Sequence, residues 1–324
     1  MAAPDPPPAA GQRLEWEQLP PALRATVEAR LGARIVAAIT QPSGFSPGVA
    51  VRLRLANGQR AFVKAVGPWP NPHAAGAHRR EAAIVAALPP AVPVPRLLWS
   101  HDEGEGGWVV LAFEEVDGRH PAQPWRADEL QRVLTTLQEL ATQLTPAPAR
   151  GAAWRPAAEW YVVQHPSWRL LRDEWSAHAG QLDAWSTRHL DALVDLAAQA
   201  PAAVTGETLL HLDVRADNLL LTPERVLLVD WPHARVGAAW VDVVFFASSV
   251  AMQGGPSPQQ LLASYPPAAE ADPQAVTAVV SAIAGFFTLE ARLPPPPGLP
   301  TLRQFQAAQS AVARCWLAER TGWP

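Results

Sequence analysis

The sequence predicts an α+β fold in two parts: a small antiparallel sheet with one inserted helix, then a larger, mainly helical part. Up to about residue 113, short apolar runs alternate with turns, whereas from Asp128 onward apolar residues recur with helical spacing. The charge divides at the same place. Residues 1–113 hold 11 basic and 8 acidic groups, and residues 114–324 hold 15 and 22.

The elements of the first part follow from the spacing of its apolar residues. Asn57–Gly58 separates two alternating apolar runs, and an Asn-Gly pair in that position is typical of a β-hairpin. Pro89–Pro90 ends the inserted helix, because proline cannot continue helical hydrogen bonding. The expected elements, in chain order, are an amphipathic helix over 14–32, strands over 35–40, 49–55 and 60–66, a helix over 78–88, and strands over 96–100 and 108–113.

The second part carries apolar residues at intervals of three and four, as amphipathic helices do. One β-rich interruption, residues 208–229, lies inside it. We interpret the fourteen tryptophans mainly as buried core residues rather than as a sugar-binding surface. The expected helices cover 130–144, 157–176, 182–199, 240–252, 257–264, 273–291 and 301–320.

The composition is that of a globular chain, with 48% hydrophobic and 17% charged residues. A net charge of −4 without a basic tract argues against nucleic-acid binding, and the single cysteine, Cys315, excludes an internal disulfide. The longest uncharged apolar stretch, Val276 to Leu289, is too short to cross a membrane and predicts a core helix. Residues 1–12 are rich in proline, resemble no signal peptide and predict a disordered tail. We expect a soluble cytoplasmic protein without a membrane partner; the sequence does not define its oligomeric state.

Two scarce residue types single out particular positions. The chain has 25 arginines but one lysine, Lys64, and three asparagines, at 57, 71 and 218. An arginine fork and a lysine ammonium are not interchangeable in a tight phosphate site. Lys64 is therefore a candidate functional residue.

The most informative segment is the β-rich interruption, whose loop and hairpin read HLDVRADNLLLTPERVLLVDW from His211 to Trp231. The hairpin brings Asn218 and Asp230 to neighbouring positions at one end of its strands. Oxygen ligands from an Asn and an Asp suit a hard cation such as magnesium, with phosphate oxygens completing the shell. Asp213 would lie beside the metal, free to accept a proton from a substrate hydroxyl.

The pattern His-x-Asp-x-x-x-x-Asn, then a hairpin and an Asp closing an apolar strand, resembles the catalytic core of the aminoglycoside phosphotransferase and choline kinase families. These families are relatives of the protein kinases. The resemblance implies a protein-kinase-like bilobal fold that uses ATP and Mg²⁺. It implies that Asp213 is the catalytic base, that Asn218 and Asp230 bind magnesium, and that His211 supports the loop.

Some features of the loop depart from the family or leave its chemistry open. Arg215 fits electrostatic stabilisation of the transferred phosphoryl group, and it fits pairing with Asp217 equally well. The family often has Gly after the His, where this chain has Leu212. Ala216–Asp217 and Pro232 are also unusual, but no expected metal ligand or base is missing.

The resemblance covers residues 36 to 250 and implies further roles. Lys64 would contact the α- and β-phosphates with Glu81 as its partner, although Glu81 also fits a solvated helix face. Asp242, which opens an apolar helix, would brace the catalytic loop. The remaining nucleotide contacts would come from a phosphate-covering loop and an adenine-binding hinge: Ser43, Gly44, Phe45, Ser46 and Gly48 in the loop, and Phe113, Glu114 and Val116 in the hinge.

The sequence thus predicts a nucleotide-binding lobe over 13–113, a hinge over 114–118 and a catalytic, substrate-binding lobe over 119–324. The predicted function is transfer of the ATP γ-phosphoryl group to a hydroxyl of a small molecule. The acidic second lobe is compatible with a cationic acceptor such as an aminoglycoside or an amino alcohol, and a sugar or another antibiotic fits almost as well. A protein kinase is disfavoured by the short connection from Asp230 to Asp242. A pseudokinase that binds nucleotide or a partner without turnover is the other alternative.

Overall fold

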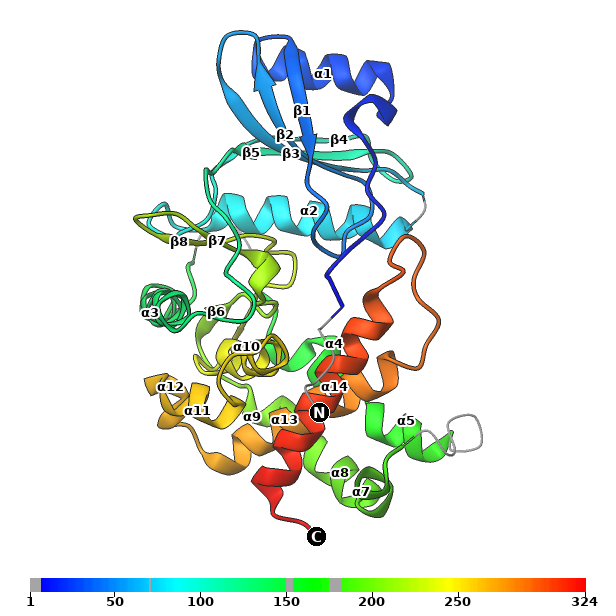
Figure 1. The fold of residues 1–324 in the computed structure, drawn as a ribbon, viewed down its shortest axis with the longest axis vertical. Coiled ribbons are helices and arrows are strands. Elements are labelled where there is room, and N and C mark those ends of the chain that lie inside the picture. The colour runs from blue at the N-terminus through cyan, green and yellow to red at the C-terminus, as the bar shows by residue number, and fades with distance from the viewer. Residues whose placement is uncertain (1–6, 70, 150–153, 175–181) are drawn as a thin grey trace.

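The structure is a computed structural model that describes residues 7–69, 71–149, 154–174 and 182–324. Two lobes are stacked along its long axis (Figure 1). The upper lobe holds a five-stranded sheet with one helix on each side, and the lower lobe is mainly helical. The α+β arrangement expected from the sequence is confirmed.

The sheet of the upper lobe is antiparallel throughout, in the order β1-β2-β3-β5-β4. The turn between β2 and β3 falls at the predicted Asn57–Gly58 pair, with Gly58 at a φ of 85°. The elements of this lobe are η1 (Trp16–Gln18), α1 (Pro21–Leu31), β1 (Ile35–Thr40), β2 (Val49–Leu55), β3 (Arg60–Val66), α2 (Pro72–Ala87), β4 (Leu97–Asp102) and β5 (Val109–Glu114).

Both faces of the sheet are covered, which fixes the strands that carry site residues. On one face Leu23 and Val27 of α1 pack with Val51 and Val63 in a separate small core. On the other face α2 packs against β3, β4 and β5, and its apolar residues join the core that continues into the lower lobe. The side chain of Asn71 caps α2, accepting a hydrogen bond from the backbone N of His73 at 3.0 Å.

The lower lobe packs its helices around α13, which is buried along most of its length. Among the described residues α13 is the one helix long and apolar enough to cross a membrane by length and composition, and 67% of it is buried inside the protein. It is therefore the core helix that the sequence predicts. The helices of this lobe are α3 (Ala127–Gln143), η2 (Ala157–Glu159), α4 (Tyr161–Gln164), α5 (Ser167–Asp173), α7 (Ala184–Arg188), α8 (Leu190–Ala197), α9 (Ala200–Ala203), η3 (Ala216–Asn218), α10 (Val241–Met252), α11 (Pro258–Ala263), α12 (Pro266–Ala269), α13 (Pro273–Glu290) and α14 (Leu302–Thr321).

Two short ribbons complete the lower lobe. β7 (Leu219–Leu221) pairs with β8 (Val226–Leu228) as the predicted hairpin, and β6 (Thr208–Leu210) pairs with β9 (Arg235–Gly237). The ribbons flank the segment 211–218, which connects β6 to β7. This segment is therefore held at both ends by strand pairing.

Four predicted helices are wrong in their extent. The helix expected over 78–88 begins six residues earlier, at Pro72, because Asn71 caps it and a proline is favoured at the first helical position. The helix expected over 14–32 begins only at Pro21, because a proline is favoured at the first helical position and residues 16–18 form a separate 3₁₀ turn. The helix expected over 157–176 is divided into η2, α4 and α5, with Pro166 between the last two, and residues 175–176 lie outside the described part. The helix expected over 182–199 is two helices that meet at His189.

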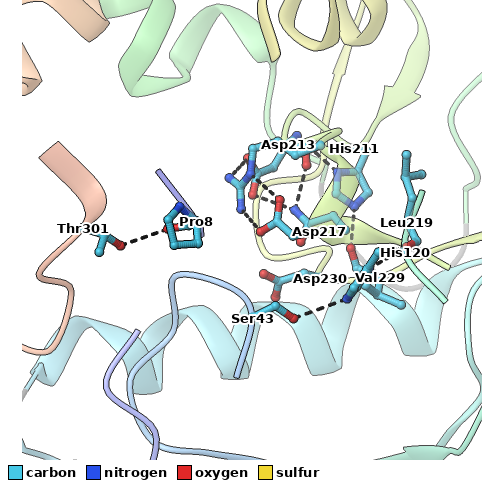
Figure 2. Close-up of polar contacts among 12 residues, drawn as sticks. Pro8, Ser43, His120, His211, Asp213, Asp217, Leu219, Val229, Asp230 and Thr301 are labelled. Carbon is cyan, nitrogen blue, oxygen red and sulfur yellow. Dashed lines mark hydrogen bonds and ion pairs between the residues drawn. The ribbon is translucent and has the colours of Figure 1, made fainter. Parts of the chain in front are cut away.

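The N-terminal segment differs from the expected tail. Residues 1–6 lie outside the described part, but residues 8–12 form hydrogen bonds to both lobes. The backbone N of Gln12 donates to Gly298 O at 2.7 Å, and the Thr301 hydroxyl donates to Pro8 O at 3.2 Å and Ala10 O at 3.1 Å. On the upper side, Gly44 N donates to Ala9 O at 2.9 Å. Figure 1 shows this segment running from α1 towards the lower lobe, and Figure 2 shows the contact between Pro8 and Thr301.

Candidate active site

The loop between β6 and β7 is shaped by Asp242, at the start of α10. Its two carboxylate oxygens accept hydrogen bonds from His211 N at 2.9 Å and Leu212 N at 2.7 Å. Leu212 has a φ of 60°, a left-handed conformation that a residue with a large side chain adopts at a cost. Asp242 therefore stabilises a strained turn just before Asp213, in the place where the resemblance puts a bracing Asp.

His211 lies behind this loop and not in the cavity. It is 1% exposed, and its Nε2 hydrogen-bonds to Val229 O at 3.0 Å (Figure 2). Its Nδ1 accepts from Asp213 N at 3.2 Å, and its ring packs edge-on against Trp231. Burial lowers the pKa of His211 to about 4, so the ring is neutral and ties the loop to the hairpin.

Asp213 is held by two neighbours on its own loop. Arg215 Nη1 donates to its Oδ1 at 2.6 Å, and Asn218 Nδ2 donates to its Oδ2 at 3.0 Å. Burial raises the pKa of Asp213 to about 7, the charge of Arg215 opposes that shift, and Asp217 and Asp230 add to it. A carboxyl group whose pKa lies near neutral pH is suited to act as a general base.

Arg215 pairs with Asp217, which is one of the two roles that the sequence left open, and it also contacts Asp213. Besides Asp213, it donates from Nε and Nη2 to the two oxygens of Asp217 at 3.0 and 2.9 Å. Burial alone would lower the pKa of Arg215, but Asp213 and Asp217 together raise it above its ordinary value. The guanidinium also lies 5.5 Å from the ring centre of Phe45, which places it under the predicted phosphate-covering loop.

Lys64, Glu81 and Asp230 meet although they are far apart in sequence. Lys64 Nζ donates to Glu81 Oε1 at 2.7 Å and to Asp230 Oδ1 at 3.0 Å. The contact joins β3, α2 and the end of the β7–β8 hairpin, and so crosses from one lobe to the other. Burial would lower the pKa of Lys64, but the two carboxylates outweigh it and raise the pKa. Asp230 has a φ of 69°, a second left-handed non-glycine residue at this site.

A cavity of about 140 Å³ between the lobes collects most of the predicted nucleotide-binding residues. Its lining includes the hinge residues and also Lys64, Asn218 and Asp230. Gly48 is the exception. It has a φ of 105° and lies so close to Ala65 O that an added Cβ would be 2.5 Å away, so its role is to let the chain enter β2. The predicted residues that do line the cavity are Ser43, Gly44, Phe45, Ser46, Lys64, Glu81, Phe113, Glu114, Val116, Asn218 and Asp230.

Among the lining residues that were not predicted, Arg13 and His120 make hydrogen bonds to the loop over the cavity. Arg13, next to the N-terminal segment, donates to the carbonyl oxygens of Gln41, Ser43 and Ser46 and so holds the loop from inside. His120 contacts Ser43 Oγ through Nε2 at 3.3 Å and Leu219 O through Nδ1 at 2.9 Å (Figure 2). Neither belongs to a local motif, and only the fold brings them to the site.

A second cavity, of about 350 Å³, opens beside the first. Asp213 and Arg215 line it, together with Phe45 from the upper lobe and residues of α13 and α14. The Phe45 ring meets the Phe305 ring edge-on, with 5.1 Å between their centres. The structure thus has two adjoining cavities, with Asp230 in the wall of both.

Asn218 and Asp230 can accommodate a divalent cation. The amide nitrogen of Asn218 donates to Asp213, which leaves its oxygen as a ligand. Asp230 uses one oxygen for Lys64 and has the other to offer. No group of three or more His, Cys, Asp or Glu residues suited to a metal occurs among the described residues. Two protein oxygens beside a phosphate-sized cavity are the donor set that magnesium accepts when phosphates complete its shell.

Comparisons with known proteins agree with this geometry. The model of the phosphotransferase enzyme family, APH, matches residues 38–278. The chain therefore belongs to this family of phosphotransferases. Comparison with the curated proteins gives no match.

Solved structures share the fold at low identity. One, described as a fructosamine-3-kinase from Thermobifida fusca, has a TM-score of 0.55 and 21% identity, covering 90% of this chain and 99% of that one. A thermostable mutant of an aminoglycoside phosphotransferase in complex with AMP-PNP and hygromycin B has a TM-score of 0.58 and 14% identity, covering 91% and 98%. The choline kinase LicA of Streptococcus pneumoniae has a TM-score of 0.55 and 12% identity, covering 90% and 98%. The predicted kinase-like fold and the predicted family are confirmed.

Proposed function

We propose that this phosphotransferase moves the γ-phosphoryl group of ATP, with magnesium, to a hydroxyl of a small molecule. The contact of Lys64 with Glu81 and Asp230 supports the proposal most strongly. It holds the chain's only lysine between Glu81 on α2 and Asp230 at the end of the β7–β8 hairpin. Complexes of relatives with AMP-PNP, ADP and GDP are in keeping with a nucleotide co-substrate. A cytoplasmic location belongs to the same proposal.

Each residue of the site would have a separate role in the transfer. Phe113, Glu114 and Val116 would contact the adenine, and Lys64 the α- and β-phosphates. Asp213 would orient the acceptor hydroxyl and take its proton as the oxygen attacks phosphorus. Arg215, held by Asp217, would offer positive charge to the transferred group.

The metal would add one further contribution. Asn218 and Asp230 would hold a magnesium ion, which when bound supplies positive charge at the phosphate oxygens. Lys64 would then have to exchange its contact with Asp230 for the nucleotide phosphates. The salt bridge between them keeps both side chains in place until that exchange.

The test is acceptor-dependent ADP release with magnesium and ATP over a panel of aminoglycosides, other hydroxylated antibiotics, sugars and amino alcohols. Asp213→Asn keeps the shape of the side chain but removes the base, so activity should fall by about 10²–10⁴-fold. Asp195→Asn, at an exposed position of α8 away from both cavities, is the matched control and should leave activity unchanged.

The outcomes separate the alternatives. ATP binding without ADP release across the panel would favour the pseudokinase, and labelling of a protein acceptor would favour a protein kinase. Failure to bind ATP at all would contradict the proposal.

A further inference from the structure

The second cavity has the position of an acceptor site, and its charges restrict what it can hold. The carboxylates among its described lining residues are Glu81, Asp213 and Asp230. Each already faces a cation: Glu81 and Asp230 share Lys64, and Asp213 contacts Arg215 at 2.6 Å. Of the 30 acidic residues in the chain, only Asp5 lies outside the described ranges. An acceptor with several ammonium groups would bury them here without free carboxylates, which is strongly unfavourable.

Six aromatic side chains, together with aliphatic residues, make up much of the rest of the wall. Trp160, Phe286 and Phe305 are 3%, 6% and 3% exposed, so their positions are fixed by the core. Such rings bind apolar faces, and they can also bind a single quaternary ammonium. Here, however, Arg215 already lies over the Phe45 ring at 5.5 Å and Arg80 also lines the cavity, so an organic cation would meet like charge. The aromatic residues of the wall are Phe45, Trp160, Phe245, Phe286, Phe287 and Phe305.

One polar group in this wall lacks a partner. Gln309 of α14 is 3% exposed, lines the cavity, and makes no hydrogen bond to any residue that the structure describes. Its neighbour one turn earlier, Gln306, receives a hydrogen bond from Arg303 at 2.8 Å. A carboxamide in a cavity wall that has no protein partner offers both a donor and an acceptor to a hydroxyl of a bound molecule.

We propose that the second cavity binds an uncharged hydroxylated molecule with an apolar or aromatic face, and that Gln309 hydrogen-bonds one of its hydroxyls. This inference rests on the proposed function and assigns the class of its acceptor. The aromatic side chains pack against the apolar face of the bound molecule, and Gln309 hydrogen-bonds a hydroxyl at its polar edge. The expectation of a cationic acceptor, drawn from the overall charge of the lobe, does not carry over to this cavity.

The test measures acceptor binding rather than turnover. The full chain is saturated with magnesium and a non-hydrolysable ATP analogue and titrated by calorimetry with p-nitrophenyl glucoside, kanamycin and choline. The glucoside should bind at least about tenfold more tightly than the two cations. Gln309→Leu should weaken its binding by about tenfold, the loss of roughly one hydrogen bond in a buried site. Gln304→Leu, at an exposed position of the same helix, should leave it unchanged.

Every other result overturns the inference. Tighter binding of kanamycin or choline would show a cationic acceptor site, absence of glucoside binding would show that the cavity does not take this class, and an unaffected Gln309→Leu variant would remove the residue's role. Failure of the proposed function is distinguishable, since a preceding titration with magnesium and the ATP analogue alone would then show no binding. Circular dichroism of each variant checks that α14 remains folded.

Discussion

At the scale of single residues, the site depends on carboxylates whose neighbours set their ionisation. Asp213, Asp217 and Asp230 lie around Arg215 and Lys64, and the charges of Asp217 and Asp230 raise the pKa of Asp213. Burial would raise the pKa of Asp230, but Lys64 outweighs it and holds that pKa below the ordinary value. Asp213 is shifted the other way. The two carboxylates are therefore ionised over different pH ranges, as metal ligand and base require.

The raised pKa of Asp213 predicts the pH profile of the enzyme. A protonated Asp213 cannot accept a proton, so kcat/KM should rise with pH up to about 7 and level off above it. Arg215→Gln removes the charge that lowers this pKa and should move the rise to higher pH. Arg54→Gln, an exposed arginine on β2, should leave the profile unchanged. A profile in Arg215→Gln that coincides with the wild type would contradict this account.

Replacing Arg13 should weaken nucleotide binding, because this side chain holds the loop over the first cavity. Its guanidinium donates hydrogen bonds to the backbone carbonyls of residues 41, 43 and 46. A hydrogen bond to a charged group contributes about 1.5–3 kcal/mol. Arg13→Gln should therefore weaken binding of the ATP analogue by roughly tenfold or more, measured by calorimetry. Arg34→Gln, exposed in the same lobe, serves as the control. Equal affinities in the two variants would show that the loop does not need this support.

At the scale of elements, the sequence predicted what local patterns determine. The five strands, the α2 helix and α10, α11, α13 and α14 all follow from periodicity and from proline and glycine positions. Pairing of β6 with β9 could not be predicted, because each strand has three residues and 24 residues separate them. The site divides in the same way. Asp213, Asn218 and Asp230 lie within one local motif, whereas Arg13, His120 and Gln309 come from distant segments and are recognisable only when folded.

Gly285 on α13 shows how closely one element fits its neighbour. A Cβ there would lie 2.7 Å from the ring of Trp168, which is 1% exposed and donates to Ser281 O at 2.8 Å. Gly285→Ala should lower the free energy of unfolding by about 1–3 kcal/mol in urea denaturation, because the ring cannot move away. Gly76→Ala is the matched control. It has only the end of the Arg80 side chain nearby, at 3.5 Å, and should gain roughly 0.5–1 kcal/mol from helix propensity. Stabilisation in both variants would mean that the ring adjusts freely.

At the scale of the whole molecule, several links cross between the lobes, among them the hinge, the Lys64–Asp230 salt bridge, the Phe45–Phe305 contact and residues 8–12. The last of these joins Gly44 on one side to Gly298 and Thr301 on the other. Together with Arg13 it ties the loop of residues 43–48 to the lobe that carries Asp213. The relative position of the lobes is thus set partly by a segment outside both.

Removing this segment should loosen the lobes. A chain lacking residues 1–12 loses the hydrogen bonds to Gly44, Gly298 and Thr301, and its Tm should fall by roughly 3 °C or more. A chain lacking only residues 1–6 keeps these bonds and should melt with the full-length protein in differential scanning calorimetry. Equal melting of all three chains would show that the segment does not hold the lobes together.

The single lysine has a consequence beyond its proposed contact with the nucleotide phosphates. Lys64 carries the only side-chain amine in the chain, and it lies at the floor of the nucleotide cavity with 15% of its side chain exposed. An amine-directed acylating reagent therefore has one internal target. Its rate of reaction reports how often the cleft opens, and a bound nucleotide should slow it. The rate at which Lys64 is modified thus measures opening of the cleft without any added label.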